Sequence, residues 1–162
     1  TGLFGSIIAS IDSGNQINPQ WIDQLADRLK NQPLEQVSIL WLDKLTDCTS
    51  RRKCKKEVVQ IPRLIHSALA YKALNHRNRA LLYTILAKYF YQVESNTDKA
   101  IQYGRRAISS DRSNLYYHLN LSKFLPTSGR KKETIKALDA LSRLDINGQH
   151  TAEIAKLRKM AE

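Results

Sequence analysis

The feature that most constrains the fold is a self-similarity at a spacing of thirty-four residues in the C-terminal half of the chain. A fixed period of this length is typical of helix–turn–helix repeats, in which each unit buries its apolar face only by stacking on its neighbours. Two repeats are therefore predicted, at about 81–114 and 115–148. The matching positions are Tyr83 with Tyr117, Ala87 with Leu121, Phe90 with Phe124, Ile101 with Ile135 and Asp111 with Asp145.

The rest of the chain carries apolar residues at the three- and four-residue spacing of amphipathic helices, and no segment alternates as a strand would. Asn18 and Pro19 are typical of a helix start, and Ser113 is expected to cap the helix of the second repeat. Residues 1–17, with Gly5 and Gly14, are predicted to be irregular. The expected helices span about 18–30, 34–45, 58–74, 80–93, 97–108, 115–125, 130–144 and 150–161.

The segment 98–111 resembles the second helix of a tetratricopeptide unit, with Ala100 and Ala107 at its two small-residue positions. It departs from the family at Gly104, where an aromatic residue is usual. The resemblance implies an all-α fold of helical hairpins stacked as a short tetratricopeptide-like superhelix with capping helices. The expected organisation is an irregular N-terminal segment at 1–17, a helical pair and cysteine loop at 18–56, and a repeat region with a C-terminal cap at 57–162.

The geometry of that family also implies a concave groove that binds a protein or peptide. Tyr89, Tyr116 and Lys123 occupy groove positions and are the candidate binding residues there. The family's carboxylate-clamp pattern is absent, because Ile85 and Tyr89 replace the Lys and Asn of its first unit. Core packing is the competing interpretation of these tyrosines.

Cys48 and Cys54 are the only cysteines, and the polar segment between them predicts a surface loop. A disulfide between them would indicate an oxidising compartment. Two free thiols remain the alternative, and neighbouring cations would lower their pKa enough for a redox role. A metal site is disfavoured, since no nearby His or Cys completes a set of four ligands.

The chain has a formal net charge of +11, and this excess lies after residue 50, where the net charge is +14 against −3 in residues 1–50. Such a surface attracts anions, including acidic proteins, anionic lipid headgroups and phosphorylated glycans. The densest basic cluster surrounds Cys54 and is the candidate anion-binding loop; its members are Arg51, Arg52, Lys53, Lys55 and Lys56. Solvated charge is the alternative interpretation. Nucleic acid is a less favoured partner, because aromatic residues do not interleave with the basic clusters.

No catalytic signature is present in the sequence: it has no glycine-rich phosphate loop, no nucleophile elbow and no zinc-protease motif. The four histidines are scattered, with no two at metal-ligand spacing. We therefore expect no catalytic residue, no metal and no cofactor, and a fragment that is not itself an enzyme. No apolar run reaches the roughly 18–20 residues of a membrane helix. Because the chain begins at Thr1, we expect it to be a piece of a longer protein.

The layout of the chain resembles the periplasmic C-terminal domain of the O-antigen ligase/polymerase and protein O-oligosaccharyltransferase family. The resemblance lies in the segment 7–17, the helix of Trp21, the Cys48/Cys54 loop and the divergent repeats. It implies a domain at the periplasmic face of the inner membrane that helps to position an acceptor protein or a lipid-linked glycan. The alternatives are a free-standing tetratricopeptide adaptor that scaffolds protein assembly, in the envelope or the cytoplasm, and a regulatory domain that binds nucleic acid.

Overall fold

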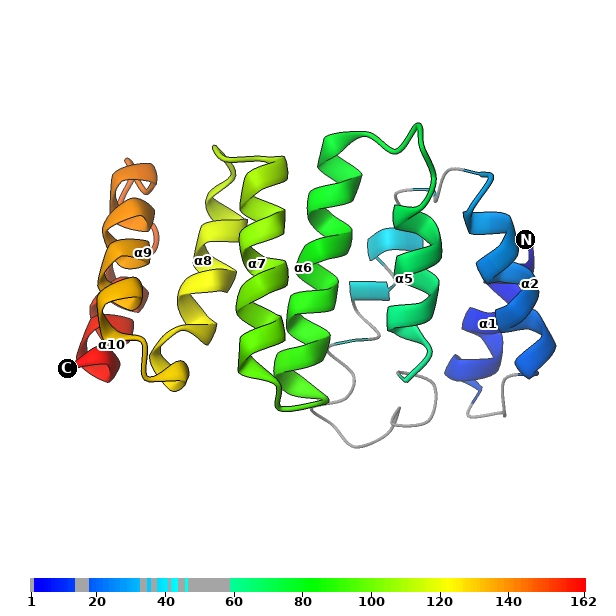
Figure 1. Cartoon of the computed structure of the whole chain (residues 1–162), viewed down its shortest axis with the longest axis horizontal. Coiled ribbons are helices and arrows are strands. Elements are labelled where there is room, and N and C mark those ends of the chain that lie inside the picture. The colour runs from blue at the N-terminus through cyan, green and yellow to red at the C-terminus, as the bar shows by residue number, and fades with distance from the viewer. Residues whose placement is uncertain are drawn as a thin grey trace.

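Helices alone make up the regular structure of the described part of the chain (Figure 1), which confirms the predicted all-α class. The structure is a computed structural model and describes residues 2–13, 18–32, 35, 38–40, 42, 43, 46 and 59–162. Cys48, Cys54 and the candidate anion-binding loop lie outside the described residues. The helices are α1 (Leu3–Asp12), α2 (Pro19–Leu29), α5 (Ile61–Leu69), α6 (His76–Gln92), α7 (Thr97–Ser110), α8 (Leu115–Phe124), α9 (Lys131–Leu144) and α10 (Thr151–Ala161), with a 3₁₀ turn at Pro126–Ser128.

Asparagine side chains begin four of these helices. The Asn18 Oδ1 accepts a hydrogen bond from the amide of Gln20 at 3.0 Å, as the Asn18-Pro19 pair predicts. Asn75, Asn96 and Asn114 cap α6, α7 and α8 in the same way. A cap of this kind contributes about 1 kcal/mol by satisfying an amide that the helix leaves unpaired. The prediction that Ser113 caps α8 is wrong by one residue, because Asn114 has the extended backbone and the acceptor in reach.

The prediction of an irregular segment at 1–17 is wrong for residues 3–12, which form α1. Gly5 and two serines weaken the local helical preference. Tertiary packing compensates, because Ile7 is buried in the main core and Leu3 packs against the same cluster. Helical stability in proteins comes mostly from such packing, so a weak local pattern does not exclude a helix.

Two consecutive hairpins, α6 with α7 and α8 with α9, lie side by side, and the second extends toward the C-terminal end of the molecule (Figure 1). Ala100 and Ala107 are fully buried where α7 meets α6, as expected for small-residue positions that allow close approach. Ala107 also packs with Ala80 of α6 and Tyr117 of α8. One small cluster therefore joins three consecutive helices, and it stacks the second hairpin directly on the first.

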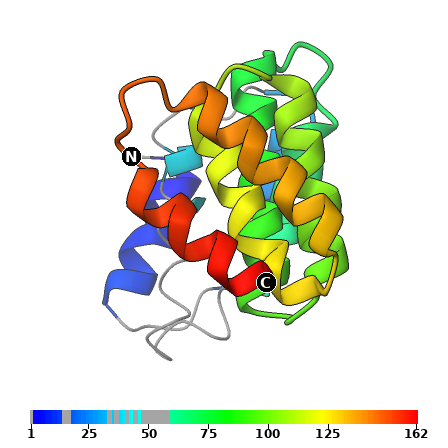
Figure 2. The ribbon, with the colours of Figure 1, turned by 90° about the vertical axis from the view of Figure 1, so that its left-hand side faces the viewer.

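The C-terminal end of the stack is closed by α10, which lies beside α9 and over α8 (Figure 2). Ile154 and Leu157 of α10 are buried against Leu119 of α8 and against Leu138 and Leu141 of α9. The chain turns at Gly129 between α8 and α9 and at Gly148 between α9 and α10, and the φ angles of 71° and 65° at these positions suit glycine. At the other end α2 packs on α5, and Arg63 pairs with Asp23 at 2.5 Å.

Candidate binding groove

The three residues predicted to line a concave groove lie in different surroundings. Tyr89 is only 3% exposed, and burial, reinforced by the Glu94 carboxylate, raises the pKa of its hydroxyl. Lys123 forms an ion pair with Glu153 of the closing helix at 3.2 Å. Tyr116 is 40% exposed and lines a small cavity of about 110 Å³ that neither Tyr89 nor Lys123 lines. Of the cavities of about 110, 390 and 580 Å³ among the described residues, none is lined by all three side chains.

An earlier part of the chain covers the same side of α6. Ile39 and Leu42 are buried in the core together with Leu82 and Ile85 of α6. Asp43 pairs with Lys88 of α6 at 2.7 Å, and both side chains are mostly shielded from solvent. The positions of α6 that would line a concave groove are thus covered by Ile39, Leu42 and Asp43 of the chain itself.

The opposite side of α6, between α5 and α7, is filled by aromatic rings. Tyr103 of α7 stacks on Phe90 with ring centroids 5.4 Å apart and also lies 6.2 Å from the ring of Tyr83. The Arg106 guanidinium covers Tyr103 at 5.3 Å, a cation–π contact. His66 of α5 closes this cluster, and burial together with the positive charge of Arg106 lowers its pKa.

The next space along the stack, between α7 and α9, is open instead. It holds a cavity of about 580 Å³, which we call the α7/α9 groove. Ala137 and Ala140 line it and stand thirty-four residues after Tyr103 and Arg106, the residues that fill the preceding space. Small side chains at these two positions leave the second space unfilled. The ten described lining residues are Arg105, Ile108, Ser109, His118, Leu121, Leu125, Glu133, Lys136, Ala137 and Ala140.

The α7/α9 groove combines an apolar floor with a charged rim. Leu121 and Leu125 of α8 are buried and form the floor, with Ile108 of α7 beside them. Arg105 crosses from α7 to α9 and pairs with Glu133. The exposed Lys136 has no ion-pair partner among the described residues. A pocket with apolar walls and a few convergent polar groups is the usual form of a binding site.

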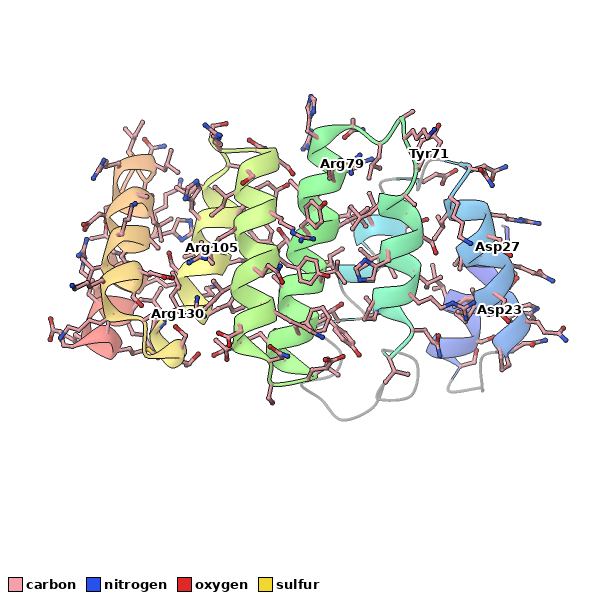
Figure 3. The ribbon with its side chains drawn as sticks, viewed as in Figure 1. Asp23, Asp27, Tyr71, Arg79, Arg105 and Arg130 are labelled. Atoms are coloured by element: carbon pink, nitrogen blue, oxygen red, sulfur yellow. The ribbon has the colours of Figure 1, made fainter. Side chains whose placement is uncertain are left out.

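A second ion pair spans the same two helices next to the groove. Arg130 at the start of α9 pairs with Asp98 of α7 at 2.6 Å and lies 3.7 Å from Glu133. Figure 3 places Arg105 and Arg130 in the space between α7 and α9. A shallower cavity of about 390 Å³ adjoins here and adds Lys99 and Arg106 to the charged surface. The ion pairs hold α7 and α9 in register at one end of the groove.

His118 is the one described titratable ring in the α7/α9 groove, and its Nε2 donates a hydrogen bond to the carbonyl oxygen of Arg112 at 2.8 Å. Within the described part of the chain, no three His, Cys, Asp or Glu side chains gather as a metal site would require. None of the described helices is long and apolar enough to cross a membrane. The arrangement offers apolar contact and charge to a ligand.

The sequence signal for this groove lies in the repeat itself. The spacing that pairs Tyr83 with Tyr117 also pairs Tyr103 with Ala137, so a large-to-small change marks the unfilled space. Arg105 and Arg130 were visible only as members of basic clusters. A scan against protein-family models, a search of curated proteins and a search of solved structures each found no match to this chain.

Proposed function

We propose that this chain is a helical-repeat interaction module that holds part of a partner protein in the α7/α9 groove. The observation that carries the proposal is the contrast between two equivalent spaces of the stack. Tyr103 and Arg106 fill the first, whereas Ala137 and Ala140 leave about 580 Å³ in the second. Ile108, Ala137 and Ala140 line this space and are partly exposed. A ligand that covers them would stabilise the complex, since burying apolar surface yields about 25 cal/mol per Å².

Binding is favoured over catalysis by the chemistry of the lining. Ser109 and His118 both border the groove, but His118 is held through Nε2 by the main chain at Arg112. A nucleophile needs a base within hydrogen-bond reach and a group that orients that base. The carboxylate in the lining, Glu133, is instead engaged by Arg105 and Arg130. We therefore propose that any chemistry belongs to another part of the parent protein or to its partner.

The layout of the chain supports a proposal for the parent as well. We propose that the module is the soluble, periplasmic region of a membrane-bound glycan polymerase or ligase, or of an O-oligosaccharyltransferase. There it would help to position the acceptor protein or the lipid-linked glycan. The support is the resemblance in the segment 7–17, the helix of Trp21, the Cys48/Cys54 pair and the repeats. A free-standing adaptor that scaffolds protein assembly is the second candidate, and it uses the same groove.

Fractionation of native cells, followed by detection with an antibody against this domain, distinguishes the membrane-bound enzyme from the free-standing adaptor. The membrane-enzyme proposal predicts a band much larger than 18.5 kDa in the membrane fraction. Protease added to spheroplasts should clip that band without lysis of the cells. A soluble band near the mass of the chain itself would contradict the membrane-enzyme proposal and leave the free-standing adaptor as the remaining candidate.

Site-specific photo-crosslinking in the same cells tests the groove. A photoreactive residue at position 136, on the rim of the groove, should capture a discrete protein adduct. The same residue at position 159, an exposed site on α10 that does not line the groove, is the matched control. Equal adducts from both positions, or none from position 136, would overturn the proposal.

A further inference from the structure

Resting on the proposed function, we infer that the occupant of the α7/α9 groove is an acidic amphipathic segment of the partner protein. Its aliphatic side chains would rest on Leu121 and Leu125, and its carboxylates would face the cations of the rim. The groove runs between two helices over a third, and helix faces with apolar anchors commonly bind in such grooves. A cavity of about 580 Å³ accepts a few side chains rather than a whole helix.

The charge around the groove favours a negatively charged occupant. The linings of the groove and of the adjoining cavity together contain five cations and two carboxylates. Both carboxylates, Asp98 and Glu133, are already paired with arginines. The excess positive charge therefore faces solvent, at Lys136 in particular, and favours a partner with negative charge. The cations are Lys99, Arg105, Arg106, Arg130 and Lys136.

The apolar floor distinguishes an acidic protein segment from nucleic acid, the other anionic macromolecule. Proteins that bind single strands stack the bases on aromatic side chains along a basic groove. Among the ten described residues that line the α7/α9 groove, none is Phe, Tyr or Trp. Arginine and aromatic rings meet instead in the preceding space, where Arg106 already covers the half-buried Tyr83 and Tyr103. Aliphatic floor residues match aliphatic side chains instead.

The expected changes in affinity follow from the two kinds of contact, the charge pairs at the rim and the apolar contacts at the floor. The rim contacts are exposed, so each charge pair contributes less than about 1 kcal/mol, which is about fivefold in affinity. Two aliphatic side chains that the occupant buries in the groove contribute more, at least about tenfold in affinity each. Loss of the anchors should therefore weaken binding more than loss of one charge.

The test titrates the purified chain with three fluorescein-labelled peptides of about twelve residues, and anisotropy reports binding. The first carries leucines on one helical face and glutamates on the other, the second replaces each glutamate by lysine, and the third replaces each leucine by serine. A deoxythymidine oligonucleotide of the same length serves as the nucleic-acid probe. We expect the acidic leucine peptide to bind at least about tenfold more tightly than either variant peptide.

Variants of the chain locate the site. Ala137→Tyr, which restores the residue type of Tyr103, should reduce binding of the acidic peptide at least tenfold through loss of the anchor pocket. Lys136→Glu should weaken it about threefold to tenfold, whereas the matched Lys159→Glu on α10 should change it by less than about twofold. Circular dichroism is used to check that each variant is folded. If Ala137→Tyr does not fold, Lys136→Glu on the exposed rim still tests whether the peptide binds in the groove.

Three outcomes would overturn the inference: equal binding of the glutamate and lysine peptides, unchanged binding to Ala137→Tyr, or an oligonucleotide that binds more tightly and displaces the peptide. The crosslinking experiment separates this failure from failure of the proposed function. A protein adduct from position 136 together with failed peptides would overturn only the acidic chemistry of the occupant. Absence of the adduct as well would overturn the proposal that the chain is an interaction module.

Discussion

A Cβ atom placed on Gly104 of α7 would lie 3.1 Å from Cδ1 of Leu121 on α8. This distance is tighter than an ordinary contact, so Leu121 takes the space beside α7 that an aromatic residue of a regular tetratricopeptide unit would need. Leu121 also forms part of the floor of the α7/α9 groove. Its terminal carbons therefore border open volume, and the side chain has room to yield.

We predict that Gly104→Ala stabilises the chain by about 0.5–1 kcal/mol. Glycine inside a helix costs up to about 1 kcal/mol relative to alanine, and Leu121 can move by a few tenths of an ångström into the groove. Urea unfolding followed by circular dichroism measures the change. Gly104→Tyr is the contrasting variant and should destabilise, because Leu121 cannot yield to a whole ring. A loss of more than about 1 kcal/mol in Gly104→Ala would show that Leu121 is fixed.

The pair of Asp43 and Lys88 leads to a second prediction. Asp43→Ala should destabilise the chain by about 1–3 kcal/mol, since Lys88 is only 8% exposed and would lose a carboxylate 2.7 Å away. Asp27→Ala is the matched control and should cost clearly less, because Asp27 pairs with Lys30 on an exposed surface. Equal effects in the two variants would contradict a structural role for the pair of Asp43 with Lys88 of α6.

Ser122 gives a prediction of opposite sign. Its Oγ is fully buried and has no hydrogen-bond partner among the described residues, whereas the Ser142 Oγ donates to the carbonyl oxygen of Leu138 at 2.9 Å. Ser122→Ala should therefore raise the free energy of unfolding by about 1 kcal/mol more than Ser142→Ala does, since both gain the same helix preference. Equal gains in the two variants would show that the Ser122 hydroxyl has a partner.

The pKa of Tyr117 predicts a loss of stability in alkali. Burial, with a smaller contribution from the Asp111 carboxylate, raises this pKa to about 12 from 10.0. Above pH 10 the unfolded chain releases the phenolic proton and the folded chain keeps it, so stability is intact below pH 10 and falls by about 2 kcal/mol as the pH approaches 12. Tyr117→Phe has no phenolic proton at this position and therefore lacks this pH-dependent part of the stability. The difference between the two proteins, measured by urea unfolding from pH 8 to 11.5, should shrink with pH; a constant difference would contradict it.

Local signals in the sequence predicted the C-terminal half well. The breaks near Gly129 and Gly148 and the presence of the helices of both hairpins are properties of short segments, and the structure confirms them. The predicted start of α6 at residue 80 is wrong, because Asn75 caps the helix and it begins at His76. The irregular N-terminus was predicted wrongly because Ile7 is stabilised by distant residues of the core, which no local pattern records.

The candidate groove was harder to predict for the same reason. Tyr89 was expected near a concave surface, but Ile39 and Leu42, nearly fifty residues earlier, pack on that side of α6. The change from Tyr103 to Ala137 was present in the alignment of the repeats. Its meaning depended on knowing that Tyr103 fills the space between α5 and α7, which only the packed structure shows.

The measurement that tests the central claim most directly is photo-crosslinking from position 136 in native cells, with and without Ala137→Tyr. The account predicts that Ala137→Tyr remains folded, with thermal stability equal to or above that of the parent, because the ring covers the apolar floor as Tyr103 does in the preceding space. The protein adduct from position 136 should disappear in that variant. An undiminished adduct from a folded Ala137→Tyr would show that the α7/α9 groove is not where this chain holds its partner.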